Sequence, residues 1–370
     1  MCYPFFFDLD GIYRSTNSGA TWNLTSAPND PNTNSWTAVA SSADGDKLVA
    51  VMGGGDGAIY TSTDAGLTWH KTFAAVDDYD CVASSADRTK LVAASNYGQG
   101  IYVSSNSGAT WVNAYNGRQY GGEFWRSVAM SADGKTMVAA EAEGYVAGYP
   151  PSRCMLACST NSGLSWWISS APTNQLWWAV ACSTNGTFMV AAALESYASS
   201  PVPGPIYVSH DSGANWTATT APLATWGSLA CSADGTRVTA GTTAAEINTT
   251  IGACYSIDSG TNWTVDTNLF GADFLASSAD GSKRVAAESY LYVSHTQPGF
   301  SIPKLNIARS GKNVLLYWVT NQFGVSLQQE TNLAAPNWIT MTNIPVISNG
   351  QNQVLVLPSN RQNFFRLGSP

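Results

Sequence analysis

The sequence is poor in charged residues, which make up only 11% of the chain, against about a quarter of a typical soluble domain. Its polar surface must come from uncharged side chains such as Ser, Thr and Asn together with Gly, which suits short strands joined by tight turns. The 25 acidic residues outnumber the 17 basic ones, and the formal charge of −8 argues against nucleic acid as a partner. No apolar window of about 18 residues occurs, so we expect no membrane insertion.

Metal-binding and disulfide signatures are also scarce. The chain has seven cysteines, an odd number, without a CxxC or Cys/His metal spacing. Cys182 and Cys231 occupy one repeat position where other copies carry Ser or Met, which predicts small buried thiols. A single disulfide through Cys154 or Cys158 is the alternative interpretation.

The first residues, MCYPFFFDLDG, lack the features of a secretory signal. There is no basic start, and the apolar run is short and contains Pro4. The segment resembles the middle of the repeat described next, with residues 3–7 as a strand. We therefore expect the natural start to lie upstream, which leaves room for an export signal.

What the sequence does contain is an eight-residue repeat, S-x-[DN]-x-G-x-[TSN]-W. The Asp or Asn side chain can accept hydrogen bonds from backbone amides further along the turn, and Gly supplies the positive φ of its corner. Calcium loops are the functional alternative, but the run of carboxylates that calcium needs is missing, and three copies carry Asn. Six copies begin 42 to 55 residues apart, at residues 15–22, 62–69, 104–111, 159–166, 209–216 and 256–263.

A second pattern precedes most copies of the motif. Two apolar runs flank an Asp-Gly turn, as in WTAVASSADGDKLVAV from Trp36, which indicates a β-hairpin. Hairpin and motif together give four strands in about 40 to 50 residues, the size of one propeller blade. We predict an all-β fold with a seven-bladed β-propeller, because the third strand recurs seven times. A six-bladed ring, in which residues 272–290 pair with 11–25, is the runner-up.

The eight-residue motif resembles the Asp-box, or BNR, repeat of sialidases, two-propeller xyloglucanases, sortilin-like receptors and photosystem II assembly factors of the Ycf48 type. The resemblance covers residues 11–295 and implies a β-propeller whose Asp-boxes lie opposite the active-site face. It does not extend to the catalytic signatures. The Arg-Ile-Pro of sialidases is missing, and only one propeller is present where the xyloglucanases have two.

The repeat ends near Pro298, so we divide the chain into a propeller, 1–298 with an incomplete first blade, and a second domain, 301–370. The second domain alternates apolar and polar residues in short runs such as NVLLYWVT. It resembles the small C-terminal β-sandwich module of exported bacterial proteins of the Verrucomicrobia type. This resemblance implies a secreted or cell-surface protein.

The ligand face is predicted from loop variability. In a propeller, the turns between the first and second strands and between the third and fourth strands share one face, and here they are short and repetitive. The connections on the opposite face are long and variable, which favours that face for ligand. Aromatic residues recur just before each first strand and would ring the mouth of the central channel, with Trp178 and Arg126 beside them. These are Trp36, Tyr79, Trp125, Trp177 and Trp226. The alternative is that each ring packs between adjacent blades.

Acidic residues gather on the same face. Glu141, Glu195 and Glu288 follow second strands and are the candidate catalytic carboxylates, while Asp80 and Asp273 precede first strands. A pair of carboxylates can perform acid–base chemistry on a glycoside, and a cluster can hold a divalent cation. Solvated loop carboxylates are the alternative. No cofactor follows firmly; calcium or zinc is the candidate ion, and its ligands are unknown.

The sequence therefore favours an exported propeller that binds a glycan or another small-molecule ligand at the channel mouth, as a monomer. The alternative is a hydrolase, a glycosidase or an esterase-like enzyme, which uses loop carboxylates or a bound metal on the same face. A purely structural surface protein is the third hypothesis. Whether the chain is an enzyme stays open, because no Ser-His-Asp triad or GxSxG motif is present.

Overall fold

The computed structural model divides into two compact units, residues 1–295 and 296–370, which are described separately. It describes residues 11–17, 21–28, 35–54, 56–95, 100–115, 124–142, 154–173, 175–194, 202–243, 252–266, 274–287, 291–294, 306–310, 313–319, 326–330, 339–341, 346–348, 351–356 and 364–368.

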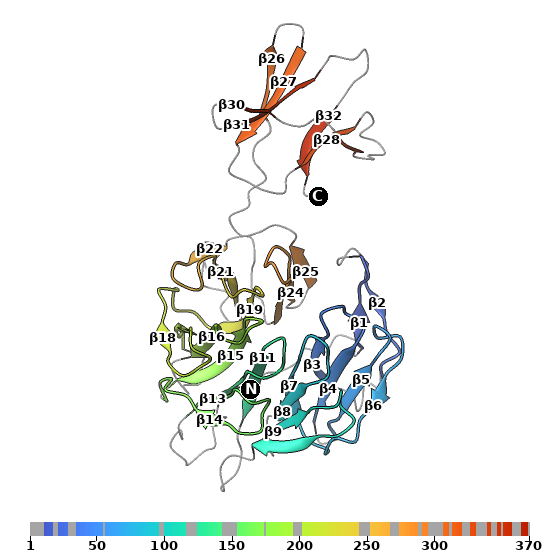
Figure 1. Cartoon of the computed structure of the whole chain (residues 1–370), viewed down its shortest axis with the longest axis vertical. Helices are drawn as coiled ribbons and strands as arrows, with labels where there is room; N and C mark the ends of the chain where they lie inside the picture. The colour runs from blue at the N-terminus through green and yellow to red at the C-terminus, as the bar shows by residue number, and fades with distance from the viewer. Residues whose placement is uncertain are drawn as a thin grey trace. The chain divides into compact units, whose positions relative to one another are not determined.

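The described strands of the first unit form seven antiparallel sheets, in which neighbours in the chain are neighbours in the sheet (Figure 1). The sheets are β1–β2 (Tyr13–Arg14, Asn23–Leu24); β3–β6 (Ser35–Ser41, Leu48–Gly53, Ile59–Ser62, His70–Lys71); β7–β10 (Tyr79–Ser84, Leu91–Ser95, Ile101–Ser104, Val112–Tyr115); β11–β14 (Trp125–Met130, Met137–Glu141, Leu156–Ser159, Trp167–Ile168); β15–β18 (Leu176–Cys182, Met189–Leu194, Ile206–Ser209, Thr217–Ala218); β19–β22 (Trp226–Cys231, Val238–Thr242, Ala253–Ser256, Thr264–Asp266); and β23–β25 (Phe274–Ser277, Arg284–Ala287, Leu291–Ser294).

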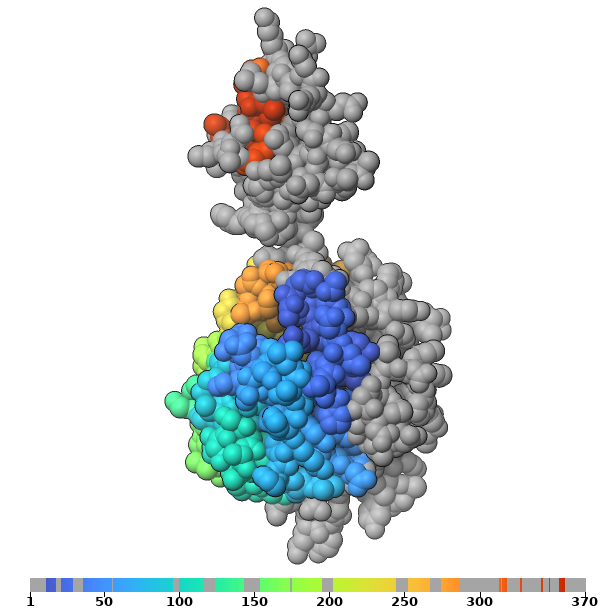
Figure 2. All heavy atoms as spheres, turned by 90° about the vertical axis from the view of Figure 1, so that its right-hand side faces the viewer, coloured from blue at the N-terminus to red at the C-terminus, as the bar shows by residue number. Residues whose placement is uncertain are grey.

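This arrangement is the predicted all-β propeller. The first strand of each sheet contacts the first strand of the next, from β3 through β7, β11, β15 and β19 to β23, as inner strands around an axis do. Figure 2 shows the sheets following one another over the surface in chain order. The six-bladed alternative has residues 272–290 pairing with 11–25. Among the described residues β24 pairs with β25, and β1 pairs with β2; the blade count stays a prediction. Within the described residues there is no helix of the length and apolar character that crosses a membrane.

The eight-residue motif forms the turn between the third and fourth strands. In the copy at 209–216, the Gly213 amide donates to Ser209 Oγ (3.0 Å) and the Asn215 amide donates to Asp211 Oδ1 (2.8 Å). Ser212 and Gly213 both have positive φ. The Ser212 amide also donates to the carbonyl of Thr187, in the turn between the first two strands of the same sheet (3.0 Å). The two kinds of turn therefore lie at the same edge of the sheet, as predicted.

Hydrogen bonds also connect successive sheets through their inner turns, that is, the turns between the first and second strands. The amide of Ala43 donates to the carbonyl of Ala86, that of Ala86 to Ala132, and that of Ala132 to Thr184 (2.8 Å each). The series continues from Thr184 to Ala233 (2.8 Å) and from Ala233 to residue 279 (2.6 Å). From β3–β6 to β23–β25, each sheet is thus held to the next by a backbone hydrogen bond between turns as well as by its core.

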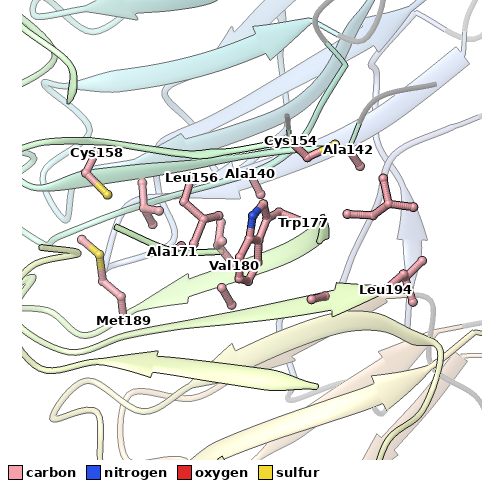
Figure 3. Close-up of a cluster of buried hydrophobic side chains, with 14 residues drawn as sticks. Ala140, Ala142, Cys154, Leu156, Cys158, Ala171, Trp177, Val180, Met189 and Leu194 are labelled. Atoms are coloured by element: carbon pink, nitrogen blue, oxygen red, sulfur yellow. The ribbon is translucent and has the colours of Figure 1, made fainter. Parts of the chain in front are cut away.

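The core of the unit lies between the sheets. Figure 3 shows one cluster, in which Trp177 of β15 packs against Ala140 of β12 and Leu156 of β13. Further clusters of the same kind fill the spaces between other neighbouring sheets. Second strands such as β8 and β16 are buried along their whole length, because a sheet packs on each of their faces.

The cysteines behave mostly as small core residues. Cys154, Cys158 and Cys254 are buried, while Cys182 and Cys231 are partly exposed. Burial raises the pKa of Cys158 and of Cys231 to about 12, so both are protonated near neutral pH. Cys158 has a free thiol in this structure, so the alternative of a disulfide through this residue does not describe the fold.

The second unit contains two antiparallel sheets. The first has the order β26 (Asn306–Ser310), β27 (Asn313–Val319), β31 (Gln351–Val356) and β30 (Val346–Ser348), and the second has the order β29 (Ile339–Thr340), β28 (Ser326–Glu330) and β32 (Phe364–Gly368). Leu316, Leu327 and Val354 are buried. Two sheets with buried apolar residues on both fit the small β domain that the alternating pattern predicted.

Candidate functional site

The five aromatic residues predicted to ring the channel mouth lie at the start of five first strands. Tyr79, Trp125, Trp177 and Trp226 have no exposed surface, and Trp36 is partly buried. Their rings pack within and between sheets: Tyr79 is edge-on to Tyr102 at 5.5 Å, and Trp177 is edge-on to Tyr207 at 5.2 Å. The packing alternative therefore describes the four buried rings, because a ring without exposed surface offers no face to a ligand.

Three of these side chains also donate a hydrogen bond to the backbone of a nearby connection. Trp226 Nε1 donates to the carbonyl of Gly204, in the connection between β16 and β17 of the preceding sheet (2.9 Å), and the Tyr79 hydroxyl donates to the carbonyl of Ala75, in the connection that leads into its own strand (2.7 Å). Trp36 Nε1 donates to the carbonyl of Pro28 (3.2 Å). The aromatic position is thus a structural feature of the repeat, with its apolar body in the core and its polar tip on the backbone.

The residue that follows each aromatic has a different role, because the strand bulges there. In five sheets the register shifts by one residue directly after the aromatic. A β-bulge leaves its extra residue outside the ladder and redirects its side chain, and bulges of this kind are frequent beside active sites. We call these five partly exposed residues the bulge row: Thr37, Asp80, Arg126, Trp178 and Gly227.

Arg126 connects three neighbouring sheets through the bulge row. Its Nη1 lies 3.4 Å from Asp80 Oδ2 in the preceding sheet, and both side chains are 24% exposed. Its guanidinium carbon lies 5.0 Å from the ring centroid of Trp178 in the following sheet. The Nε atom of Arg126 is buried and has no hydrogen-bond partner among the described residues. A cation held by an ion pair and an aromatic ring is preorganised.

Asp80 is the second polar member of the row. Burial raises the pKa of its carboxyl group, the charge and hydrogen bond of Arg126 oppose that shift, and the neighbouring negative charge of Asp78 adds to it. Asp78 is held in place by Gly54, whose amide donates to Asp78 Oδ1. The bulge row and the residue before β7 therefore combine two electrostatically coupled carboxylates with one arginine.

Close backbone contact positions this pair of carboxylates. A Cβ atom added to Gly53 would lie 2.9 Å from Asp78 Oδ1 and 3.0 Å from Thr37 Cγ2, so a larger residue would displace both. The Thr37 hydroxyl in turn donates to the carbonyl of Tyr79 (2.7 Å). The loop after β4 and the loop before β7 are therefore fitted to each other across two sheets.

The structure describes one of the three predicted catalytic glutamates. Glu141 ends β12 directly opposite Trp125 and is buried, with 2% exposure. Glu195 and Glu288 lie outside the described residues, as do Glu143, Glu246, Arg153 and Asp273. Glu141 therefore belongs to the packed part of the sheet in this structure. The described carboxylates at or next to the bulge row include Asp78 and Asp80.

No group of three or more His, Cys, Asp or Glu side chains that could hold a metal ion occurs within the described part of the chain. The predicted calcium or zinc ion therefore has no ligand set among these residues, and it stays a prediction for the loops outside them.

The sequence analysis identified Arg126 and Trp178 as candidate ligand-binding residues and noted Asp80. It relied mainly, however, on the five aromatic residues beside them. Thr37 and Gly227 were missed. The sequence did contain a signal for this position. Each of the five residues stands eight positions before the last residue of its Asp-Gly-type turn, and its residue type varies between copies while the other positions of the block vary little. Asp273 has the same spacing in the sixth copy. One variable position in a repeated block is typical of function, whereas repeated residues are typical of packing.

No protein-family model matches this chain, and no curated protein matches it. Among solved structures it is similar to the GH74 xyloglucanase from Xanthomonas campestris, with 15% identity and a TM-score of 0.61 over 84% of this chain and 55% of that one. It is similar to a GH74 enzyme from Niastella koreensis, with 14% identity and a TM-score of 0.54 over 77% and 50%.

YCF48 from Cyanidioschyzon merolae is also similar, with 14% identity and a TM-score of 0.55 over 79% of this chain and 90% of that one. The chain spans about half the length of the two GH74 enzymes. At these identities the likeness concerns the fold, and the fold is a β-propeller.

Proposed function

We propose that this propeller binds a glycan at the channel mouth, through the bulge row. The observation that carries the proposal is the placement of Arg126, which is paired with Asp80 on one side and stacked on Trp178 on the other, while all three side chains remain partly exposed. An apolar residue at a strand bulge would stabilise the fold about as well as these constrained polar residues do. Their presence there therefore favours a role in binding.

The three side chains match the chemistry of a sugar ring. The partly exposed indole of Trp178 offers an apolar surface for the C–H face of a pyranose. Arg126 supplies N–H donors and Asp80 supplies acceptors for hydroxyl groups, and hydrogen bonds to charged partners are stronger than neutral ones. One of the structurally similar proteins is a xyloglucanase, so xyloglucan oligosaccharides are the first probes to use.

The test is isothermal titration calorimetry of a glycan panel against four proteins: the unchanged chain, Arg126→Ala, Trp178→Ala and Lys135→Ala. Lys135 forms an exposed ion pair with Asp133 on the turn face and is the matched control. We expect a glycan that binds the unchanged chain and Lys135→Ala equally, and at least about tenfold more weakly to the other two, which corresponds to 1.4 kcal/mol. Binding unaffected by Arg126→Ala and Trp178→Ala together would refute this assignment.

Asp80 supports a second candidate function, a glycoside hydrolase. A carboxyl group whose pKa is raised by burial and by a second carboxylate is suited to donate a proton to a leaving group. Asp78 is the carboxylate coupled to it. Hydrolysis of a glycoside panel should then be lost in Asp80→Asn. Activity that persists in Asp80→Asn but disappears with EDTA would instead favour the metal-dependent version, and loss in Glu141→Gln alone would favour the glutamates.

We further propose that the eight-residue turns are of the Asp-box type and that the protein is exported to the cell surface or secreted. The local hydrogen bonds of the motif and the module-like second unit support these assignments. Fractionation of cells that produce the natural protein, followed by detection with an antibody against the second unit, tests the location. Recovery in the cytoplasm alone would contradict it.

A further inference from the structure

One member of the bulge row, Gly227, has no side chain. The first strands contact one another in the order β3, β7, β11, β15 and β19, so the bulge row follows the sheets in chain order. Trp178 therefore stands between Arg126 of the preceding sheet and Gly227 of the following sheet. Both Trp178 and Gly227 are partly exposed.

Long side chains at consecutive positions of the bulge row reach one another. Arg126 Nη1 lies 3.4 Å from Asp80 Oδ2 in the sheet before, and the Arg126 guanidinium carbon lies 5.0 Å from the Trp178 ring centroid in the sheet after. A side chain at position 227 would stand in the same relation to Trp178 as Trp178 does to Arg126. Because Arg126 lies over one face of the indole, glycine at 227 leaves the other face without a neighbour from the bulge row.

The backbone does not require glycine at position 227. The same register shift occurs in four other sheets, whose residues at this position are Thr37, Asp80, Arg126 and Trp178. Neither Gly227 nor any of these four residues has a positive φ. Since glycine weakens a strand and the bulge forms without it in the other sheets, its presence has another reason.

Close approach of a second group is the common reason for a glycine in such a place. At Gly57 and Gly204 the second group is the protein's own backbone. An added Cβ would overlap the carbonyl oxygen of Asp77 in the first case and that of Ala193 in the second, and both glycines are buried. Gly227 differs because solvent reaches it, so a ligand can approach it as well.

We propose that Gly227 is the specificity-determining residue of the bulge row. It leaves the indole face of Trp178 that Arg126 does not cover to a pyranose ring, whose C–H face occupies the space that a side chain at 227 would fill. The inference rests on the proposed glycan binding and adds to it the position of the stacked sugar, between Trp178 and β19. A larger residue at 227 excludes that sugar.

The test is isothermal titration calorimetry of the best-binding glycan with Gly227→Leu, made both in the unchanged chain and in the Trp178→Ala variant. The matched control is Ala218→Leu, which adds an apolar side chain to a small, exposed residue of the outer strand β18. Thermal unfolding checks that each variant folds. If Gly227→Leu melts at a lower temperature than the unchanged chain, Gly227→Thr takes its place, because β3 carries Thr37 at the equivalent position.

We expect Gly227→Leu to bind at least about tenfold more weakly than the unchanged chain, and Ala218→Leu to bind equally well. In the Trp178→Ala variant the same substitution should change affinity by less than about twofold, because the stacked sugar is already lost. Normal binding by Gly227→Leu, while Trp178→Ala binds weakly, overturns this inference and leaves the proposed function intact. An equal loss in both backgrounds also overturns it, because Gly227 would then act independently of Trp178. If no glycan depends on Arg126 and Trp178, the proposed function fails and this inference fails with it.

Discussion

Two adjacent tryptophans allow a role in packing to be distinguished from the proposed role in ligand binding. Trp177 is fully buried between two sheets, whereas Trp178 is partly exposed and lies under the Arg126 guanidinium. We expect Trp177→Ala to lower the free energy of unfolding strongly. Trp178→Ala should lower it much less and should weaken ligand binding.

The magnitudes follow from the two environments. A buried tryptophan removes on the order of 150–250 Å² from water, which at about 25 cal/mol per Å² corresponds to ~4–6 kcal/mol. The Nε1 atom of Trp177 has no hydrogen-bond partner among the described residues, and removing this desolvated donor recovers about 1–3 kcal/mol. The net loss for Trp177→Ala is therefore about 3 kcal/mol, at the lower end for such substitutions. For Trp178 the cation–π contact contributes about 0.5–1 kcal/mol.

Urea unfolding followed by circular dichroism measures both losses, provided that the slopes with denaturant agree between the variants. Calorimetry with the glycan that binds best then measures affinity. Equal destabilisation by the two substitutions would refute the division into a packing row and a bulge row. So would a stable Trp177→Ala protein that has lost binding.

Three further substitutions test other parts of the structure. Hydrogen bonds from Thr68 and Ser62 lower the pKa of Asp64 to about 2, so the stabilisation by this carboxylate is present above pH 3.8 and is lost as the pH falls toward 2. Asp64→Asn should therefore weaken the fall of the urea unfolding midpoint with decreasing pH. The variant should still fold, because Asn106 makes the equivalent bonds in another copy of the motif. Burial raises the pKa of Asp80, so its contribution to stability falls as the pH rises above 3.8, and the stability of Asp80→Asn relative to the unchanged chain should increase across that range; an unchanged difference would contradict the assignment. Gly213 has a φ of 88°, and an added Cβ would lie 2.5 Å from Cys158 Sγ, so Gly213→Ala should cost at least about 1–2 kcal/mol in thermal or urea unfolding, and a second substitution, Cys158→Ala, should restore only the contact part.

Local features were predictable from the sequence because their hydrogen bonds close within a few residues. Ser209, Asp211 and Gly213 form their turn within one eight-residue motif, so the residue types alone specify the geometry. The hairpins before each motif were predictable for the same reason, since two apolar runs and an Asp-Gly turn leave few other pairings. Regular repetition of the two patterns then indicated the propeller.

The sequence predicted where along the chain the candidate site lies, but not which of its side chains are exposed. Repetition showed that an aromatic residue begins each first strand, but burial of Trp125 and Trp177 depends on neighbouring sheets about 50 residues away, and no local pattern reports it. The bulge after each aromatic was also hidden, because one extra residue changes which side chains share a face without changing composition.

The sequence by itself determined the turns, the hairpins and the repeated blade, because these depend on backbone conformation and on contacts close in the chain. Only the tertiary structure decided which side chains are available to a ligand. It brought Asp80, Arg126 and Trp178 together from three successive sheets. That outcome depends on packing between sheets, which the pattern within one repeat cannot encode.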